Sequence, residues 1–334
     1  MPSTALDIGS YSIKAISAHP GLKPKIEKVV EIFNPEGLAL PNDDAQMEKL
    51  ANLLKNLFTD HKLSGNDVRL ALPESVISSK IINMPHLSDA ELASAIPWQA
   101  EQYIPIPPEE LALEYKVLFR PEKKSEEQMR VLLIGARKNL LNNFISVFNY
   151  LGIEPTVLET QTLSLVRSLQ FTATDPSTFI IHLGANSLLL TVVHQGELSL
   201  IFNHMSGSQI LNRALEQNLG LSKEQAEQYK RQYGLNPQEF QGKVAAALQP
   251  ALKVLLEAIQ KAIRFFASQH PQNSIQRVVL SGGGAQLPGL IEYMSSQLAS
   301  ETLIASPFAS CSGNIPEGNH AAMSICIGLL NREL

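Results

Sequence analysis

Three glycine-containing turns, each expected directly after a strand, are the residues best placed to bind a ligand. They are Gly9-Ser10-Tyr11, Gly184-Ala185-Asn186 and Gly282-Gly283-Gly284, after strands expected over 4–8, 179–183 and 276–280. Because glycine has no Cβ, such turns let a flat or anionic ligand approach the backbone N–H groups closely. The three turns together predict one ligand site.

The first two turns belong to an internal repeat. In both copies a strand, a turn, two more strands and a helix follow in the same order, over 4–61 and over 179–219. Asp7 in the first copy corresponds to His182 in the second, 175 residues later. A duplicated unit predicts two similar lobes with a cleft between them, and each lobe presents its hairpin turn to that cleft. After the third turn we expect a helix over 285–298.

Composition excludes several classes of protein. Of the 334 residues 44% are hydrophobic and 18% charged, which excludes a disordered chain. The net charge of −5 argues against a chain dominated by phosphate contacts to nucleic acid. Cys311 and Cys326 are too few for a disulfide framework or a four-thiolate zinc site, and are expected to be ordinary small apolar residues. No signal sequence or apolar run of membrane-spanning length is evident, which predicts a cytosolic protein.

An insertion separates the two copies of the repeat, over about 69–160. Within it, Ser88 and Glu91 form a capping box, so a helix is expected to begin there and to run to Tyr103. Pro97 lies inside this helix and is expected to kink it. A second helix is expected over 139–151. The insertion is therefore predicted to be an α+β subdomain.

Several segments carry a resemblance that covers nearly the whole chain. They are LDIGSYSIK at 6–14, HLGANS at 182–187, VVLSGGGAQLPGL at 278–290, ALPESVISSKIINMP at 71–85, AEQYIPIPPEELALEYKVL at 100–118 and HAAMSICIGLLN at 320–331. The first three resemble the two phosphate loops and the adenosine loop of the actin-like ATPase superfamily. The others resemble, within it, the PilM family of cytoplasmic actin-like proteins from the type IV pilus inner-membrane assembly platform.

This resemblance implies an α/β chain with the actin-like ATPase fold: two ribonuclease-H-like lobes around a nucleotide cleft, with an inserted α+β subdomain. The expected parts are 1–70 (first lobe), 71–160 (inserted, partner-binding subdomain), 161–176 with 315–334 (helices of the first lobe), 177–205 with 274–314 (second lobe) and 206–273 (helical subdomain of the second lobe).

The resemblance also implies that ATP or ADP binds with Mg²⁺. The phosphates would lie against Gly9, Ser10, Tyr11, Ser12, Lys14, Gly184, Ala185 and Asn186, and the adenosine against Glu227, Lys230, Gly282, Gly283 and Gly284. Gly207 and Ser208 would lie near the α-phosphate and the ribose; Ser208 departs from the family's second glycine, and Asn212 stands where the family usually has a Thr. Asp7 matches the family's acidic residue that orients hydrated Mg²⁺. Three plainer readings stay open: a solvated Lys14 on an edge strand, a turn-stabilising Asp7, and a surface ion pair of Glu227 with Lys230.

His182 departs from the family, which normally has a second Asp there. A neutral imidazole is a poor ligand for magnesium, so nucleotide hydrolysis is expected to be weak or absent. Glu159 and Gln161 are candidates for the residue that orients the attacking water.

The function that the resemblance implies is a nucleotide-binding adaptor that is not an enzyme. Its partner would be the cytoplasmic N-terminal tail of the inner-membrane protein PilN, in a groove beside the inserted subdomain, so the protein would lie at the inner face of the inner membrane through this partner. Pilus motor ATPases, other platform proteins and a second copy of the chain are further partners that stay open; nucleic acid is not expected. Two alternatives remain: an active ATPase or kinase of this fold, and a cell-division actin-like protein, which the lack of a basic amphipathic tail after 320–334 disfavours.

Overall fold

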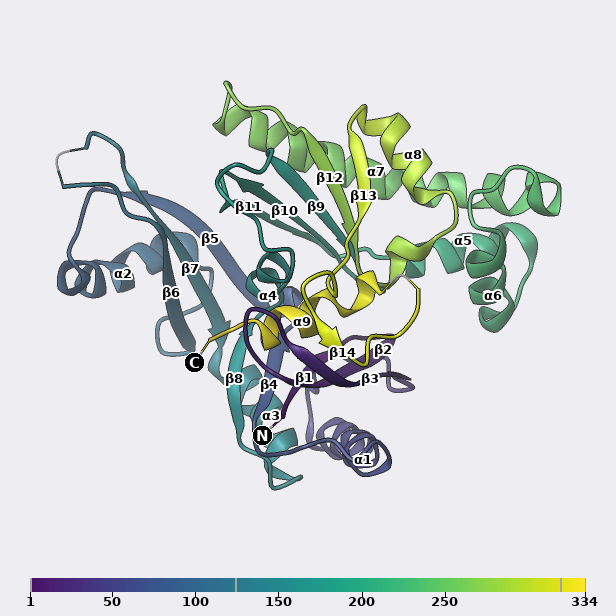
Figure 1. Ribbon diagram of the computed structural model, residues 1–334, viewed down its shortest axis with the longest axis horizontal. Helices are drawn as coiled ribbons and strands as arrows, with labels where there is room; N and C mark the ends of the chain where they lie inside the picture. The colour runs from purple at the N-terminus through teal and green to yellow at the C-terminus, as the bar shows by residue number, and fades with distance from the viewer. Residues whose placement is uncertain (1, 124, 319, 334) are drawn as a thin grey trace.

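The computed structural model describes residues 2–123, 125–318 and 320–333, and it shows two lobes with a smaller sheet to one side (Figure 1). The first lobe is a six-stranded sheet of order β14-β3-β2-β1-β4-β8. Its strands are β1 (Ser3–Ile8), β2 (Ser12–His19), β3 (Lys25–Phe33), β4 (Val68–Leu72), β8 (Pro155–Thr160) and β14 (Ser312–Gly313). The neighbours β1 and β4 are parallel, so both end at the same edge of the sheet.

Helices cover both faces of this sheet. They are α1 (Asp44–Asp60) and α3 (Lys138–Asn149) on one face, and α4 (Gln161–Ser168) and α9 (Ser324–Leu330) on the other. Because side chains alternate across a strand, Leu6 packs with α1 and α3 while Ala5 packs with α4 and α9. Both faces of β1 are therefore buried along its whole length. This packing holds Ile8, the last residue of the strand, in place directly before the first glycine turn.

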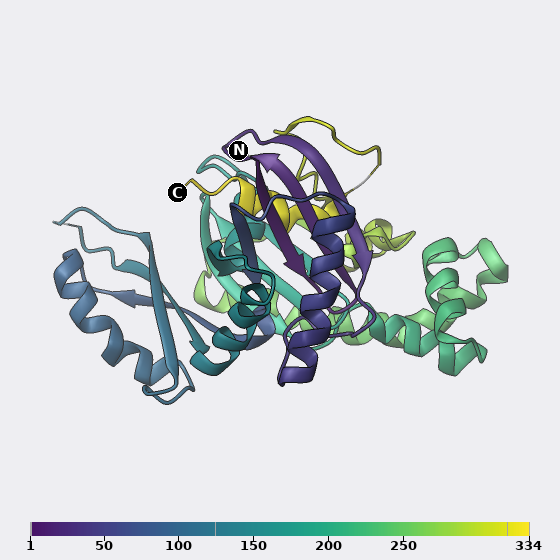
Figure 2. The same ribbon diagram turned by 90° about the horizontal axis from the view of Figure 1, so that it is seen from below.

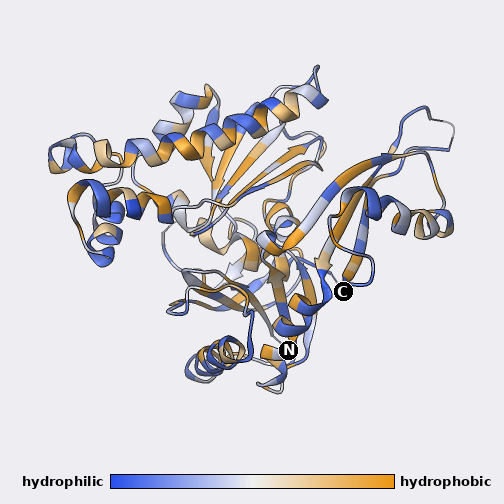
Figure 3. Ribbon diagram, turned by 180° about the vertical axis from the view of Figure 1, so that it is seen from behind, coloured by the Kyte–Doolittle hydropathy of each residue, from blue (hydrophilic) through white to orange (hydrophobic). Residues whose placement is uncertain are grey.

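The second lobe is a five-stranded sheet of order β11-β10-β9-β12-β13. Its elements are β9 (Thr178–Leu183), β10 (Leu188–His194), β11 (Glu197–His204), β12 (Arg277–Ser281), β13 (Glu301–Ile304), α5 (Gln209–Leu219), α6 (Lys223–Tyr233), α7 (Lys243–Gln269) and α8 (Leu290–Leu298). The apolar stripe of α7 packs on this sheet, and its outward face is mostly hydrophilic apart from the exposed Val254 and Phe265 (Figure 3). α5 and α6 extend away from the sheet at the far side from the insertion (Figure 2).

The two lobes repeat one hairpin, as the sequence predicts. Ile8 pairs with Ile13 at the end of the β1–β2 hairpin, and Leu183 pairs with Leu188 at the end of the β9–β10 hairpin. Each residue of the second pair lies 175 positions after its counterpart in the first, which confirms the predicted repeat at the level of strand register.

The inserted sheet has the order β5-β7-β6 and one covering helix. Its elements are β5 (Ile77–Met84), β6 (Leu111–Phe119), β7 (Met129–Arg137) and α2 (Asp89–Tyr103). The predicted Ser88–Glu91 capping box is present, and Pro97 lies inside α2. Within the range expected for the insertion, α3 packs against α1 and β8 pairs with β4, so these two elements lie with the first lobe.

The prediction of a helix over 285–298 is wrong about where the helix begins. Gly283–Gln286 form a separate 3₁₀ turn, and α8 begins only at Leu290. The reason is Gly289, whose φ of 78° is left-handed and interrupts the helix. Further 3₁₀ turns are Glu74–Val76, Glu239–Gly242 and Ala321–Met323. No helix in the described ranges combines the length and hydropathy that crossing a bilayer requires.

Candidate functional site

A cavity of about 400 Å³ lies between the lobes and takes in nearly all of the predicted ligand-binding residues. Those that line it are Asp7, Gly9, Ser10, Tyr11, Ser12, Lys14, Gly184, Ala185, Asn186, Ser208, Asn212, Glu227, Lys230, Gly282, Gly283 and Gly284. These residues come from segments up to 277 positions apart, so the fold brings the three glycine turns to one cleft.

Gly207 does not line the cavity but lies directly behind it. A Cβ at this position would be 2.5 Å from the carbonyl oxygens of Gly184 and Ala185. The same two oxygens accept hydrogen bonds from the backbone N–H groups of Ser208 and Gln209, at 2.8 and 2.9 Å. Gly207 therefore lets the start of α5 hold the second hairpin turn in place.

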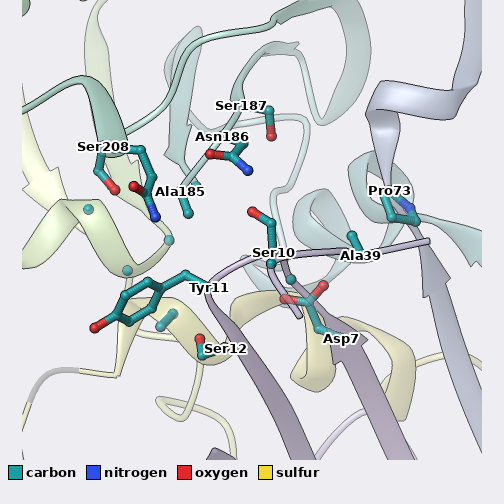
Figure 4. Close-up of a pocket in the computed structure, with 18 of the residues that line it drawn as sticks. Asp7, Ser10, Tyr11, Ser12, Ala39, Pro73, Ala185, Asn186, Ser187 and Ser208 are labelled. Carbon is teal, nitrogen blue, oxygen red and sulfur yellow. The ribbon is translucent and has the colours of Figure 1, made fainter. Parts of the chain in front are cut away.

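The two hairpin turns face each other across the cleft. Figure 4 shows Ser10 and Tyr11 on one side and Ala185, Asn186 and Ser187 on the other. Each turn is closed by one backbone hydrogen bond, from Gly9 N to Ser12 O at 3.1 Å and from Gly184 N to Ser187 O at 3.0 Å. Tight turns of this kind direct several N–H donors at one point, which suits an anion.

Lys14 is buried in the cleft, and the reading as a solvated lysine on an edge strand is wrong. β2 pairs with β1 on one side and β3 on the other, and only 8% of Lys14 is exposed. Its Nζ donates to Ser12 Oγ at 2.8 Å and lies 3.8 Å from Glu31 Oε1. Ser12 Oγ in turn donates to the same carboxylate at 2.6 Å. The chain thus keeps a cation in the cleft next to a carboxylate of its own.

Asp7 and Gln161 meet at the floor of the cleft, whereas Glu159 does not reach it. Gln161 Nε2 donates to Asp7 Oδ1 at 2.8 Å, and both residues line the cavity. Glu159 instead accepts from Ser164 at 2.6 Å and Arg332 at 3.0 Å and forms an ion pair with Arg167. Burial raises the pKa of Glu159, but the hydrogen bonds and charge of Arg167 outweigh this and lower it overall. Of the two water-orienting candidates, only Gln161 is placed near a ligand.

His182 lines the cleft as a neutral imidazole. Burial lowers its pKa to about 4, although the charge of Asp7 acts in the opposite direction. Its Nδ1 lies 3.2 Å from Ser281 Oγ at the end of the neighbouring strand β12. The second lobe therefore presents no charge to the cleft at the position where the first lobe presents Asp7. Within the described ranges, no three His, Cys, Asp or Glu side chains form a cluster suited to a metal ion.

Glu227 is the centre of a cation-rich cluster that also lines the cleft. It accepts from Lys230 at 2.6 Å, Arg231 at 2.6 Å and Asn212 at 2.8 Å. Despite burial, these partners, Lys230 foremost, lower the pKa of Glu227 to about 2. Lys230 is only 9% exposed, so this is not an ordinary surface ion pair. Asn212 Oδ1 is buried without a hydrogen-bond partner among the described residues, which leaves an acceptor for a hydroxyl of a ligand.

Sequence reasoning missed three residues of the cleft region. Arg231 stacks on the ring of Tyr11 at 5.7 Å and so joins α6 to the first hairpin turn. Glu31 partners Lys14 as described. Glu74 follows β4, accepts a hydrogen bond from Thr162, and donates through its backbone N–H to Gln161 Oε1 at 3.3 Å. Only the Glu227–Arg231 spacing could have been read from the sequence, as a helical pair four residues apart.

Burial raises the pKa of Glu74 to about 7. Its Oε2 has no hydrogen-bond partner among the described residues. Its neighbours Pro73 and Ser75 line the cavity, so the buried Glu74 carboxyl lies next to the cavity lining. The same segment continues at Ile77 into β5 of the inserted sheet.

Comparisons with known proteins identify a family and a fold. A family model described as type IV pilus assembly protein PilM matches residues 5–321. The fold is similar to a solved structure described as a PilM-PilN type IV pilus biogenesis complex, with a TM-score of 0.85, 22% identity, and coverage of 98% of this chain and 97% of that one. It is less similar to MreB5 of Spiroplasma citri bound to AMPPNP, with a TM-score of 0.57, 12% identity and coverage of 98% and 94%. The ethanolamine utilization protein EutJ from Carboxydothermus hydrogenoformans gives a TM-score of 0.58 at 13% identity, with coverage of 99% and 89%. The actin-like fold predicted from the sequence is thereby confirmed.

Proposed function

The chain belongs to the family of the type IV pilus assembly protein PilM, and from this premise we propose that it is a nucleotide-binding adaptor that holds the cytoplasmic N-terminal tail of PilN. The single observation that carries the nucleotide half is the cavity that joins two facing hairpin turns, a third glycine turn, Lys14 and Glu227. The similar protein from Spiroplasma citri is described as bound to AMPPNP, an analogue of ATP, which supports the same ligand class.

The residues present fit ATP or ADP. The two hairpin turns and Lys14 supply donors and a positive charge for phosphates. The unpartnered Asn212 Oδ1 and the Glu227 carboxylate suit the hydroxyls of a sugar. Gly283, where a Cβ would meet nothing within 4 Å, leaves room for a flat base, while Gly282 and Gly284 let this turn pack against Leu183. Asp7, fixed by Gln161, would orient the divalent cation that neutralises phosphate charge when nucleotide is bound.

Weak or absent hydrolysis follows from His182. Phosphoryl transfer relies on positioning and on charge stabilisation by metal ions and cations. Here a neutral imidazole replaces the second carboxylate, and Gln161, the candidate for orienting water, is already hydrogen-bonded to Asp7 and Glu74. A nucleotide that is bound but not hydrolysed would act structurally, because its presence between the two lobes determines how far they close.

Three observations support a PilN-binding groove beside the inserted sheet. The similar PilM structure is described as a complex with PilN. β6 is an edge strand in the described sheet order, which suits an extended peptide. Lys116 on β6 is exposed, and partial desolvation together with the charge of Arg167 lowers its pKa, so β6 lies near α4 of the first lobe.

Calorimetric titration of the full chain with ATP, and separately with a synthetic peptide of the PilN N-terminal tail, tests the proposal. We expect ATP binding with little turnover, and peptide binding that a scrambled peptide does not reproduce. Lys116→Ala is expected to weaken peptide binding, whereas the exposed Lys123→Ala in the same insertion leaves it unchanged. Rapid hydrolysis would contradict the role given to His182, and ATP binding without peptide binding would contradict the adaptor.

A further inference from the structure

His182 has one ring nitrogen held by a cluster of oxygen atoms at the end of β9. Its Nδ1 lies 3.2 Å from Ser281 Oγ. Ser281 Oγ lies 3.1 Å from Ala321 O and 3.0 Å from Ser324 Oγ. Ser324 Oγ is itself 2.8 Å from Ala321 O and donates to it.

A count of protons in this cluster assigns the tautomer of His182. A hydroxyl has a single proton to donate. If Ser281 gave its proton to Nδ1, both of its contacts with oxygen atoms would lack a hydrogen. If the proton instead points to one of those oxygens, Ser281 Oγ accepts from Nδ1–H, and three of the four contacts in the cluster carry a hydrogen, against two in the first arrangement. The imidazole therefore carries its proton on Nδ1 and a lone pair on Nε2.

This lone pair is available in the cleft. No hydrogen-bond partner of Nε2 is found among the residues that the structure describes, and His182 lines the same cavity as Asp7. The two residues are close enough for the Asp7 charge to act on the imidazole. One carboxylate and one neutral imidazole nitrogen form a donor set that suits first-row transition metals, whereas Mg²⁺ prefers oxygen ligands alone.

We infer that His182 Nε2, together with Asp7, makes the cleft prefer Mn²⁺ to Mg²⁺ as the cation that accompanies the nucleotide. This inference rests on the proposed nucleotide binding and names the divalent cation that binds with the nucleotide. The remaining ligands of the ion would be phosphate oxygens and water. Ser281 is then a positioning residue, because its hydroxyl fixes the tautomer and orientation of the ring.

The test compares the dissociation constants of AMPPNP, measured by calorimetry on the full chain, in Mg²⁺ and in Mn²⁺. Electron spin-echo envelope modulation on the Mn²⁺ sample reports directly on a coordinated imidazole nitrogen. We expect tighter binding in Mn²⁺ and a nitrogen modulation. His182→Gln removes the nitrogen ligand and is expected to abolish the modulation and to reduce the Mn²⁺ preference at least about tenfold, because even the loss of a group that hydrogen-bonds to a metal ligand costs ~10–100-fold in metal affinity.

Two further variants control for folding and for position. Ser281→Ala keeps His182 but removes the hydroxyl that fixes its tautomer. It should therefore also reduce the preference for Mn²⁺ over Mg²⁺ about tenfold. His194→Gln carries the same change on β10, outside the lining of the cleft, and should alter neither readout. Equal Mn²⁺ preference in the native protein and in His182→Gln, or a native sample without nitrogen modulation, would overturn the inference while leaving nucleotide binding intact. Failure of AMPPNP to bind with either ion would instead overturn the proposed function.

Discussion

Replacing Lys14 by methionine tests whether the cleft uses this buried cation for phosphates. Methionine keeps the length and apolar stem of the side chain and removes only the charge and the donors. At about 4 Å and an effective dielectric constant of about 20, one charge pair contributes roughly 4 kcal/mol before the cost of desolvation. A hydrogen bond to a charged group contributes a net ~1.5–3 kcal/mol, and each ~1.4 kcal/mol is tenfold in affinity.

Lys14→Met is therefore expected to raise the dissociation constant of ATP about ten- to hundredfold. The lower end is the more relevant, because Glu31 already lies 3.8 Å from Nζ and has to give up this pairing when phosphate binds. The free energy of unfolding should change by only about 1 kcal/mol, since Ser12 keeps its hydrogen bond to Glu31.

Calorimetric titration with ATP and urea unfolding together measure both effects. Lys28→Met is the matched control, because Lys28 lies in the same lobe and its Nζ donates to the carbonyls of His61 and Lys62 outside the cleft. A Lys14→Met protein that is folded and binds ATP as tightly as the native chain would refute the reasoning. Glu31→Gln, which frees Lys14, should act in the opposite direction and tighten binding.

Three further predictions concern stability. The pKa of Glu74 is about 7 in the folded protein, against an ordinary value of 4.5. Its ionisation therefore destabilises the fold above pH 7, and this penalty disappears as the pH falls below 4.5. Glu74→Gln should raise the free energy of unfolding at pH 8 by roughly 2–4 kcal/mol and leave it unchanged near pH 4, which urea unfolding at the two pH values will measure. Gly207→Ala would bring a Cβ to 2.5 Å from two carbonyl oxygens and should cost about 1–3 kcal/mol or more in thermal unfolding, while the same change at the exposed Gly283, where nothing lies within 4 Å, should cost much less. Ser88→Ala removes the capping box of α2 and should lower the free energy of unfolding by about 1 kcal/mol; an unchanged midpoint would mean that α2 frays without affecting the core.

The parts of the fold that are local in sequence could be predicted. The strand–glycine–strand units depend on alternating apolar residues and on turn glycines, so their order and their 175-residue spacing follow from the amino-acid sequence alone. The capping box at Ser88 is similarly a four-residue signal. The beginning of α8 could not be read, because nothing in the sequence shows that Gly289 takes a left-handed φ rather than a helical one.

The parts of the cleft that depend on distant segments could not be predicted. The Arg231–Tyr11 stack joins residues 220 positions apart, and Glu31 reaches Lys14 only because their strands pair in that register. Glu159 is the converse case. Its sequence position beside α4 suggested a role in the cleft, but the chain brings Arg167 and Arg332 to it, and a buried carboxylate needs such partners.

The cleft and the inserted sheet share residues, which explains how a site with little chemistry could still serve an adaptor. Gln161 holds Asp7 with its amide N–H and accepts from the backbone of Glu74 with its amide oxygen. Glu74 opens the short turn that leads at Ile77 into β5, and Gln161 opens α4, which packs beside β4 and α9. A group that displaces the Asp7 carboxylate therefore acts through one amide on both the first lobe and the start of the insertion. His182 takes no part in this connection, since its ring is held by Ser281 in the second lobe. If the proposed function holds, a neutral His182 in the cleft weakens hydrolysis and leaves the proposed link between nucleotide binding and the partner groove in place.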